Sequence, residues 1–266
     1  MKISIIITTY DRPQYLRGAI DSVLCQSFKD FELIIVNDDP RMGEADKIID
    51  SYKDSRIVYV KNKKNLAGAK SLNTGLRLAK GAYIAILDDD DVWNYSKKIE
   101  EQVRFLEYNP EYVLVGTNVI VVNYNNGKEI TRTCFATADN ELRRNIFSSN
   151  PFAHSSVMYR KDKALLVGGY DESLERGKDY DLWLRLGKTG KMMVLSGHYL
   201  SYREASFQQR NIISMRKKDA QVVLSIIWRY RKDYPNYLIP YVRQWIRVLF
   251  FSSLEIFQKI VGANSK

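Results

Sequence analysis

Four runs of apolar, mostly β-branched residues mark the first third of the chain. They cover residues 3–9, 31–36, 56–60 and 83–87. Uninterrupted runs of this kind are typical of strands that are buried on both faces of a parallel sheet. Helices are predicted between the strands over 13–24, 43–53 and 67–79, the first with Pro13 in its opening turn. This alternation predicts an α/β fold with an open, doubly wound parallel sheet.

The pattern becomes less regular after residue 95. We expect a helix over 95–107, a long strand over 112–122 with an Asn-Asn-Gly turn after it, and a helix over 180–188 among short strands. From about residue 208 the sequence has a wholly helical pattern. We therefore expect a main domain over 1–206 and a helical extension over 207–266.

Polar residues follow three of the four predicted strands. Thr8-Thr9-Tyr10-Asp11 closes the first strand, Asn37-Asp38-Asp39 the second, and the aspartates at 88–91 the fourth. Open α/β sheets bind their ligands outside the carboxyl ends of the strands, where the strand order reverses. One edge of the sheet is therefore expected to hold the chemistry.

The four consecutive aspartates, Asp88 to Asp91, are the most unusual feature of that edge. Adjacent carboxylates repel one another, which raises their pKa values unless a cation neutralises them. In extended backbone Asp88 and Asp90 point to the same side and could face one ion. A few oxygen ligands, with room for water and phosphate, suit Mg²⁺ or Mn²⁺. A solvated acidic turn is the alternative, but the place after a buried strand favours a metal site.

Two further segments carry weaker signals. Residues 65–75 lack the order of a Walker A loop, but small residues that open a helix let backbone N–H groups approach a phosphate or pack on a strand. Asp179 follows a glycine at a predicted helix start, where it could cap the helix or act as a general base. The residues alone leave both pairs of alternatives open.

The net charge of +10 is concentrated at the end of the chain. Residues 201–266 hold twelve basic and four acidic side chains, a balance of +8. Such a segment suggests an anionic partner. Over 239–251, arginines four positions apart stand among apolar and aromatic residues, as in a helix that lies in a membrane interface. Packing on the main domain or on another subunit is the alternative, and the acidic strand edge disfavours nucleic acid.

Cys25 and Cys134 are far apart and have no CxxC pattern, so they support neither a disulfide framework nor a zinc site. No signal-peptide pattern opens the chain, and no run of about 20 apolar residues could span a bilayer. These features lead us to expect a cytoplasmic protein.

Six segments, in order, resemble the family 2 glycosyltransferases with the GT-A fold. They are residues 8–12, 36–38, 65–75, 87–93, 168–172 and 179–183. Each segment alone is modest, but six in the correct order and spacing are specific. The resemblance covers about residues 2–205. It implies a Rossmann-like, mostly parallel central sheet flanked by helices, with a nucleotide-binding half at 1–94 and an acceptor half at 95–206.

The resemblance also implies an activity. It is the inverting, metal-dependent transfer of a sugar from a nucleotide-diphosphate donor, a UDP-sugar, to a hydroxyl group of a glycan or lipid-linked acceptor. Such transfers serve the synthesis of surface polysaccharides or glycoconjugates. A lipid-linked acceptor would fit a cytoplasmic enzyme on the inner face of the plasma membrane. The C-terminal helices could alternatively join subunits into an oligomer.

The matching positions imply residue roles. Asp179 falls on the catalytic base, and Asp88 and Asp90 fall on the ligands of Mg²⁺ or Mn²⁺. The donor-binding positions are Thr8, Thr9, Tyr10, Asp11, Arg12, Asp38, Asn65, Ala67, Lys70, Asn73, Asp88 and Asp89. Lys178 and Trp183 fall on the acceptor side.

Two positions depart from the family's pattern. Lys178 stands where the family often has Glu, and Glu204-Ala205 follow Tyr202-Arg203 where many members have a histidine. The contact of that histidine is therefore missing, or His198 or Arg203 supplies it. Taken alone, His154 and His198 have the character of structural histidines.

Overall fold

The computed structural model describes residues 2–41, 43–204 and 212–263. The chain divides into two compact units. One consists of residues 1–142 and 151–204, and the other of residues 143–150 and 205–266. The sequence-based boundary between 206 and 207 lies outside the described residues.

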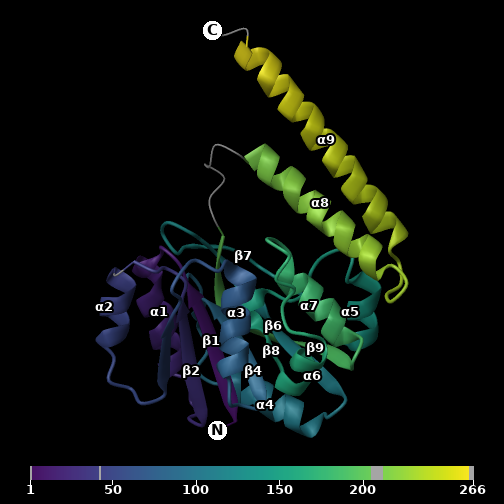
Figure 1. Cartoon of the computed structure of the whole chain (residues 1–266). Helices are drawn as coiled ribbons and strands as arrows, with labels where there is room; N and C mark the ends of the chain where they lie inside the picture. Colours follow the sequence, from purple (N-terminus) through teal and green to yellow (C-terminus); the bar gives the residue numbers. More distant parts are fainter. Residues whose placement is uncertain (1, 42, 205–211, 264–266) are drawn as a thin grey trace. The chain divides into compact units, whose positions relative to one another are not determined.

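The first half of the sheet is parallel, as the sequence predicts (Figure 1). Its strands are β1 (Ile3–Thr9), β2 (Phe31–Asn37), β3 (Ile57–Lys61) and β4 (Tyr83–Asp88). The helices that connect them are α1 (Pro13–Leu24), α2 (Glu44–Asp50) and α3 (Gly68–Leu78). The strand order β3-β2-β1-β4 reverses next to β1, so the switch point of the sheet lies between β1 and β4.

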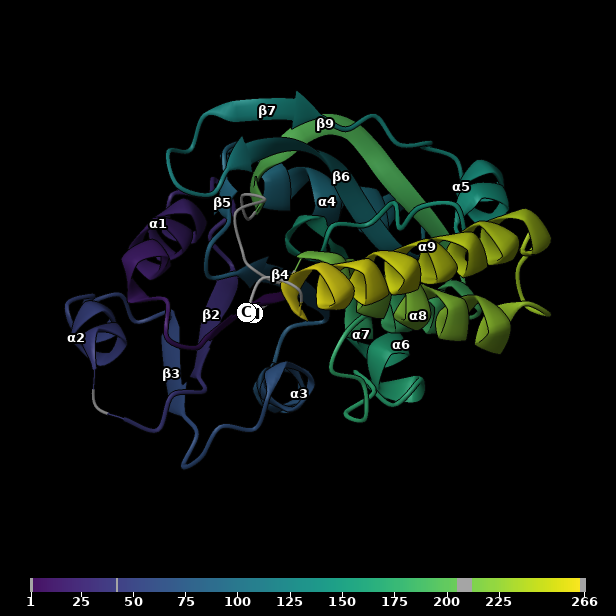
Figure 2. The ribbon, with the colours of Figure 1, turned by 90° about the horizontal axis from the view of Figure 1, so that it is seen from above.

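The second half of the sheet is mixed rather than parallel. Its strands are β5 (Val92–Trp93), β6 (Tyr112–Asn123), β7 (Glu129–Arg132), β8 (Met158–Arg160) and β9 (Lys191–Glu204). The short strand β8 runs antiparallel to both β4 and β6, whereas β6 and β9 pair in parallel. These two long strands curl together (Figure 2). The helical elements of this half are α4 (Lys98–Tyr108), α5 (Asp139–Asn145), the short 3₁₀ helix η1 (His154–Ser156), α6 (Lys161–Leu166) and α7 (Lys178–Gly187).

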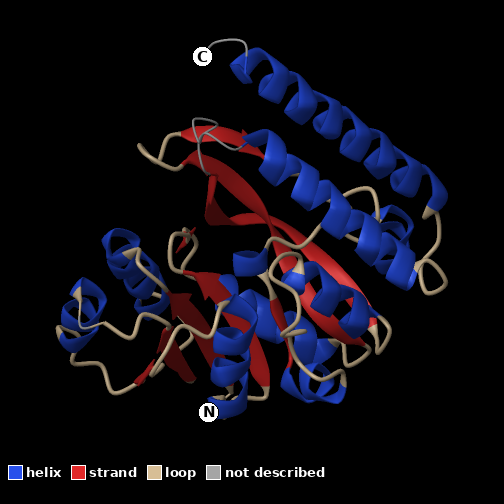
Figure 3. Ribbon diagram, turned by 45° about the horizontal axis from the view of Figure 1, so that its top comes forward, coloured by secondary structure: helices blue, strands red, loops and turns tan. Residues whose placement is uncertain are grey.

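Helices cover both faces of the sheet (Figure 3). Alternate residues of β1, such as Ile3 and Ile5, are fully buried in one apolar cluster with side chains of α1, α2 and α4. Ile6 points to the opposite face and contacts α3, where a Cβ atom on Gly75 would lie 2.6 Å from its Cγ2 atom. Only a glycine lets α3 approach the sheet this closely. Because helices cover both faces of this half of the sheet, its polar groups can reach a ligand at the carboxyl edge.

The C-terminal unit is a helical hairpin of α8 (Ile212–Tyr230) and α9 (Leu238–Ala263). Ala220, Leu224 and Val248 form its small apolar core, with Tyr241 packed against them. In the same unit, Arg243 donates a hydrogen bond to the carbonyl of Ser148 at 2.5 Å. Within the described residues, we find no helix that combines the length and hydropathy needed to cross a bilayer.

Candidate active site at the carboxyl ends of the parallel strands

A cavity of about 310 Å³ lies at the carboxyl ends of β1, β2 and β4. Its walls come from these strand ends, from the segment that leads into α3, and from the first turn of α7. The lining residues are Thr8, Thr9, Tyr10, Arg12, Asp38, Asn65, Ala67, Gly68, Ser71, Leu72, Asp88 and Lys178. The structure therefore brings together, around one space, most of the residues that the sequence predicts for donor binding.

Asp38 is held in the cavity wall through one of its two carboxylate oxygens. Its Oδ1 atom accepts hydrogen bonds from the side chain of Asn62 at 2.8 Å and from the backbone N–H of Leu66 at 2.9 Å. Asn62 also donates to the hydroxyl of Ser71 at 3.0 Å. Among the described residues, no hydrogen bond reaches the Oδ2 atom of Asp38. The carboxylate is thus fixed in place with one oxygen left for a ligand.

The chain enters α3 through Ala67, which has a φ of 67° and supplies no side-chain cap. A positive φ is uncommon for a residue with a Cβ atom. The first N–H groups of a helix have no acceptor within the helix, and this end of α3 lies in the cavity wall. The segment at 65–75 therefore offers backbone donors and the positive end of a helix dipole to an anion.

The aspartate run does not continue the strand. β4 ends at Asp88, and the backbone N–H of Asp91 closes a turn on the carbonyl of Asp88 at 3.1 Å. The expectation that Asp88 and Asp90 share extended backbone was therefore wrong. Arg12 pairs with Asp89 and with Asp90 through separate nitrogens, each at 2.5 Å, and the side chain of Asp89 is fully buried behind it.

Residues of η1 support the run from behind. His154 Nδ1 lies 2.9 Å from Asp88 Oδ1, and its Nε2 atom lies 3.0 Å from the hydroxyl of Tyr170. Ser155 donates a hydrogen bond to Asp91 at 2.5 Å and accepts one from the backbone N–H of Asp88 at 3.0 Å. Sequence reasoning took His154 only as a structural histidine and did not single out Ser155. They stand 66 and 64 positions from their partners, and no local motif marks them.

The four carboxyl groups differ in their acidity. Burial raises the pKa of Asp89 to about 7 and also raises the pKa values of Asp90 and Asp91, with repulsion from neighbouring aspartates adding to the effect. Burial acts in the same direction on Asp88, but the charge and hydrogen bond of His154 outweigh it and lower the pKa of Asp88 to about 2. Burial and mutual repulsion therefore disfavour the ionised forms of Asp89, Asp90 and Asp91, and a nearby cation would offset this effect.

The donor atoms of the site show whether a divalent cation would fit there. The donors are hard carboxylate oxygens, and Asp88 lines the cavity itself. In the part of the chain that the structure describes, no three His, Cys, Asp or Glu side chains form a ready ligand group. One or two carboxylates, with phosphate and water completing the shell, are how proteins commonly bind Mg²⁺. The residues present fit such an ion.

Helix α7 brings Asp179 to the same region. The N-cap residue of the helix is Gly177, at a φ of 70° and with no side-chain cap, so Asp179 is not the N-cap. Asp181, two residues further along the helix, is fully buried and pairs with Arg185 at 2.7 Å, which makes it a structural residue. After burial, the charges of Asp88 and Asp179 both contribute to the raised pKa of Tyr170. The two carboxylates therefore act on a common neighbour.

Four residues predicted for donor binding lie outside the cavity lining, and one of them, Asp89, is buried behind Arg12. Asp11, at a φ of 54°, pairs with Arg41 at 3.2 Å and lines a second hollow. Lys70 is exposed on α3. The amide of Asn73 is bonded on both sides to the backbone of Tyr170, at 2.9 Å each, so it joins α3 to the turn before α7.

The remaining expectations concern the second half of the chain. Trp183 is fully buried, with its ring centroid 5.7 Å from that of Tyr159. His198 is bonded to the carbonyl of Thr133 at 2.8 Å. Arg203 donates its backbone N–H to Asp91 at 2.8 Å, and its guanidinium lies 5.0 Å from the ring centre of Tyr15. None of the three lines the cavity, and Ala205 lies outside the described residues.

Comparisons with solved structures agree with this architecture. The chain is similar to Staphylococcus aureus TarS, residues 1–349, in complex with UDP-GlcNAc, with a TM-score of 0.68 and 18% identity over 94% of this chain and 71% of that one. It is also similar to the mannosyltransferase PcManGT of Pyrobaculum calidifontis, in complex with GDP-Man and Mn²⁺, with a TM-score of 0.65 and 14% identity over 97% of this chain and 75% of that one. At these identities the likeness shows the fold.

Sequence comparisons show the family. Residues 4–166 match the family model described as glycosyl transferase family 2. An uncharacterised glycosyltransferase of Methanocaldococcus jannaschii is 32% identical over 97% of this chain and 88% of its own length. The amylovoran biosynthesis glycosyltransferase AmsE of Erwinia amylovora is 30% identical over 70% of each chain. The chain is therefore a glycosyltransferase with the GT-A fold, and it belongs to glycosyl transferase family 2.

Proposed function

We propose that this enzyme transfers a sugar, with inversion, from a UDP-sugar to a hydroxyl group of a glycan or lipid-linked acceptor. The observation that carries the proposal is the cavity at the switch point, in whose wall lie Asp38, Asp88 and the first turn of α7. The cavity offers a polar group for a nucleobase, a helix end for phosphate and an acidic residue beside both. A role in making a surface polysaccharide or glycoconjugate is supported by the name of the AmsE relative.

Two groups would recognise the nucleotide. The Oδ2 atom of Asp38 would accept a hydrogen bond from the ring N–H of uracil. The backbone N–H groups at the start of α3, beside Ala67 and Gly68, would donate to the diphosphate. The solved relatives support a nucleotide-sugar donor, because one is described with UDP-GlcNAc and the other with GDP-Man.

Asp88 and Asp90 would hold Mg²⁺ or Mn²⁺, and the Mn²⁺ that accompanies GDP-Man in the PcManGT structure supports such an ion. When bound, the ion would stabilise the negative charge that gathers on the departing diphosphate. Arg12 lies against Asp89 and Asp90 and fixes their orientation. His154 keeps Asp88 ionised, the state in which a carboxylate can bind a cation.

Asp179 would act as the general base. Its carboxylate takes the proton of the acceptor hydroxyl while that oxygen forms a bond to the anomeric carbon. The bond between this carbon and the donor's phosphate oxygen breaks at the same time, and the electron pair leaves with the nucleoside diphosphate. Attack on the face opposite the leaving group inverts the anomeric carbon.

A screen of nucleotide sugars for hydrolysis and transfer in the presence of Mn²⁺ would test the donor class. Activity with one or more UDP-sugars is expected, and no binding or turnover of any nucleotide sugar would refute the proposal. Asp179→Asn should lower turnover by about 10²–10⁴-fold and leave donor binding intact. The control is Asp162→Asn, an exposed aspartate on α6. Undiminished transfer by Asp179→Asn would remove it from the role of base.

We also propose that the enzyme lies on the cytoplasmic face of the plasma membrane through its C-terminal helices. One set of apolar side chains on α9 is largely exposed: Ile239, Val242, Trp245, Ile246, Leu249, Phe250, Ile256 and Phe257. Arg243 and Arg247 are exposed on the same helix. Apolar and aromatic side chains beside arginines suit the boundary between acyl chains and anionic headgroups. The positive net charge of the segment is opposite in sign to such an anionic surface and would be attracted to it.

Vesicle co-sedimentation of the full chain would test this surface. Wild-type protein should sediment with phosphatidylglycerol vesicles much more than with phosphatidylcholine vesicles. The double change Ile246→Ser and Leu249→Ser should release it, whereas Leu166→Ser, at an exposed leucine of α6, should not. If wild-type protein stayed in the supernatant with both vesicles and formed a dimer in light scattering, the helices would join subunits instead.

A further inference from the structure

Lys178 begins α7 immediately before Asp179, yet its side chain extends to a different helix. A Cβ atom built on Gly68 would lie 3.1 Å from both the Cε and the Nζ atoms of Lys178. The ammonium group therefore lies against the first residue of α3, in the wall of the cavity. The sequence-based expectation assigned Lys178 to the acceptor side, whereas this position is next to the predicted phosphate-binding turn.

The ammonium group has no protein partner in this position. Within residues 2–41, 43–204 and 212–263, Lys178 makes neither an ion pair within 4.0 Å nor a hydrogen bond through its side chain. Other lysines near the strand ends are paired, as Lys61 is with Asp46 at 2.9 Å.

The surroundings of this ammonium suit an anion. The amino-terminal ends of α3 and α7 both lie here, and helix amino termini carry partial positive charge. Gly68 leaves room for the lysine, because a Cβ atom at this position would force the ammonium group to shift. A cation without a partner, next to two helix starts and inside a cavity, is arranged to bind phosphate.

We propose that Lys178 binds an oxygen of the donor's diphosphate, as a fixed cation supplied by the protein in addition to a metal ion. This inference rests on the proposed function, since it requires a nucleoside-diphosphate donor in the cavity. The lysine and the base Asp179 are neighbours in sequence, so the first turn of α7 serves the leaving group with one residue and the acceptor with the next.

Binding of UDP and of uridine to the full-length protein would test the assignment. Lys178→Gln should weaken UDP binding about tenfold or more, because a charge-assisted hydrogen bond is lost, and should leave the weak binding of uridine unchanged. Lys178→Arg should restore most of the affinity for UDP. The control is Lys188→Gln, an exposed lysine at the other end of α7.

A second variant tests the geometry without removing the charge. Gly68→Ala should displace the ammonium and weaken UDP binding several-fold, again with uridine unaffected. Equal UDP affinity of Lys178→Gln and wild type would overturn the inference and leave the proposed function standing. Equal losses of UDP and uridine binding would also overturn it, since the lysine would then support the fold or the base. If wild-type protein bound neither UDP nor GDP, the proposed function itself would fail.

Discussion

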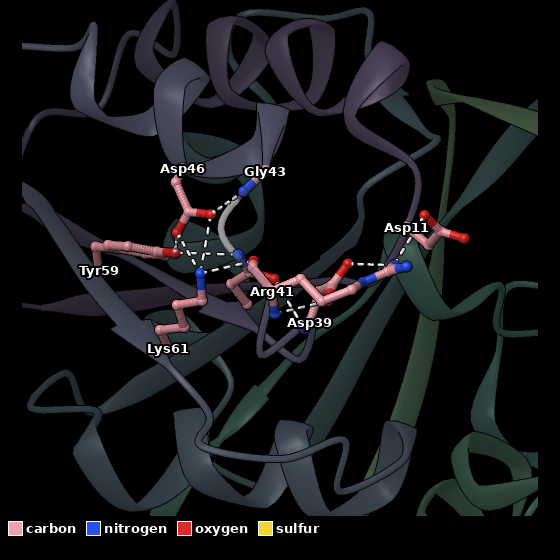
Figure 4. A network of polar contacts seen from close by, with 8 residues as sticks. Asp11, Asp39, Arg41, Gly43, Asp46, Tyr59 and Lys61 are labelled. Carbon is pink, nitrogen blue, oxygen red and sulfur yellow. Dashed lines mark hydrogen bonds and ion pairs between the residues drawn. The ribbon is translucent and has the colours of Figure 1, made fainter.

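Two hollows of about 310 Å³ lie at the carboxyl ends of the strands. They differ in how far basic side chains of the protein neutralise their aspartates. The donor cavity contains Asp38 and Asp88. The second hollow is lined by Asp11, Pro13, Asn37, Asp39, Arg41, Gly43, Glu44, Ala45 and Asp46. Figure 4 shows the polar contacts that several of these residues make with one another and with Tyr59 and Lys61. Residues that are neighbours in sequence, such as Asp38 and Asp39, thus line two different hollows, and these hollows differ in charge balance.

In the second hollow the protein neutralises its own carboxylates. Arg41 donates two hydrogen bonds to Asp39, at 2.8 and 2.6 Å, and these lower the pKa of Asp39 to about 2. Lys61 lies 2.9 Å from both oxygens of Asp46, which also accepts a hydrogen bond from Tyr59 at 2.5 Å. Asp39 and Asp46 are thus already paired with basic side chains and need no further cation to neutralise them.

The donor cavity has the opposite balance. Four aspartates share Arg12 and His154, and three of them have raised pKa values. An acidic cluster alone therefore does not mark a binding site. What distinguishes the donor cavity is the charge that the protein leaves uncompensated, on both the acidic side and at Lys178.

The largest expected effect separates the two hollows directly. Asp88→Asn should reduce the rate of transfer at least about a hundredfold. The metal ion that stabilises the negative charge of the leaving group would lose one of its proposed carboxylate ligands. Asp39→Asn should change the transfer rate less than about threefold, since the lost contacts are exposed surface pairs. Steady-state rates with the preferred donor would measure both. Comparable losses in the two variants would break the distinction between the hollows.

Removal of divalent ions should act on the donor cavity alone. EDTA should abolish transfer and most of the rise in Tm that the donor nucleotide causes, while the Tm of the free protein stays unchanged. A ligand that binds the folded state raises the Tm only to the extent that it binds, so UDP that binds more weakly without the metal ion should raise the Tm less. Thermal scans with and without UDP, before and after addition of Mn²⁺, would measure this. Donor binding that EDTA does not alter would contradict the metal assignment.

The second hollow should matter for stability instead. Lys61→Met would leave Asp46, whose side chain is 6% exposed, without its cation. We expect the free energy of unfolding to fall by about 1–3 kcal/mol, with transfer activity per folded molecule nearly unchanged. Urea denaturation gives the first quantity and initial rates the second. Lys47→Met, at an exposed pair with Glu44, is the control and should change stability by less than about 1 kcal/mol.

The smallest effect is a dependence on pH. Burial alone would raise the pKa of Asp46, but Tyr59, the N–H of Gly43 and Lys61 together lower it below its ordinary 3.8. A carboxyl group whose folded pKa is lowered stabilises the fold above its unfolded pKa, and this contribution disappears as the pH falls through the folded value. The gap in unfolding free energy between wild type and Asp46→Asn should therefore be larger at pH 7 than at pH 3. A gap that widens toward pH 3 would contradict the ion-pair network.

The parallel half of the fold could be predicted from the sequence because its signals are local. Runs such as residues 33–36 and 83–87 are apolar on both faces, which is typical of strands that are covered on both sides. The mixed half could not be predicted in the same way. The three residues of β8 carry no period of their own, and their antiparallel place between β4 and β6 depends on pairing across the chain.

The site shows the same division. Asp38 and Asp88 could be placed in advance because each ends a buried strand on the edge where ligands bind. Asp11 also follows such a strand, but its positive φ and Arg41 direct it to the neighbouring hollow. The approach of Lys178 to Gly68 joins residues 110 positions apart, as 178 − 68 gives, and only the folded backbone reveals it.

The contacts of η1 limit how this enzyme can be divided or recombined. His154 and Ser155 hold three groups of the aspartate run, yet they belong to the half of the chain that the sequence assigns to the acceptor. A fragment that ends at residue 94 would carry every aspartate of the run and Arg12, but not the η1 side chains that hold Asp88 and Asp91. A chimaera that combines halves of two relatives would therefore need η1 and β4 from the same parent protein.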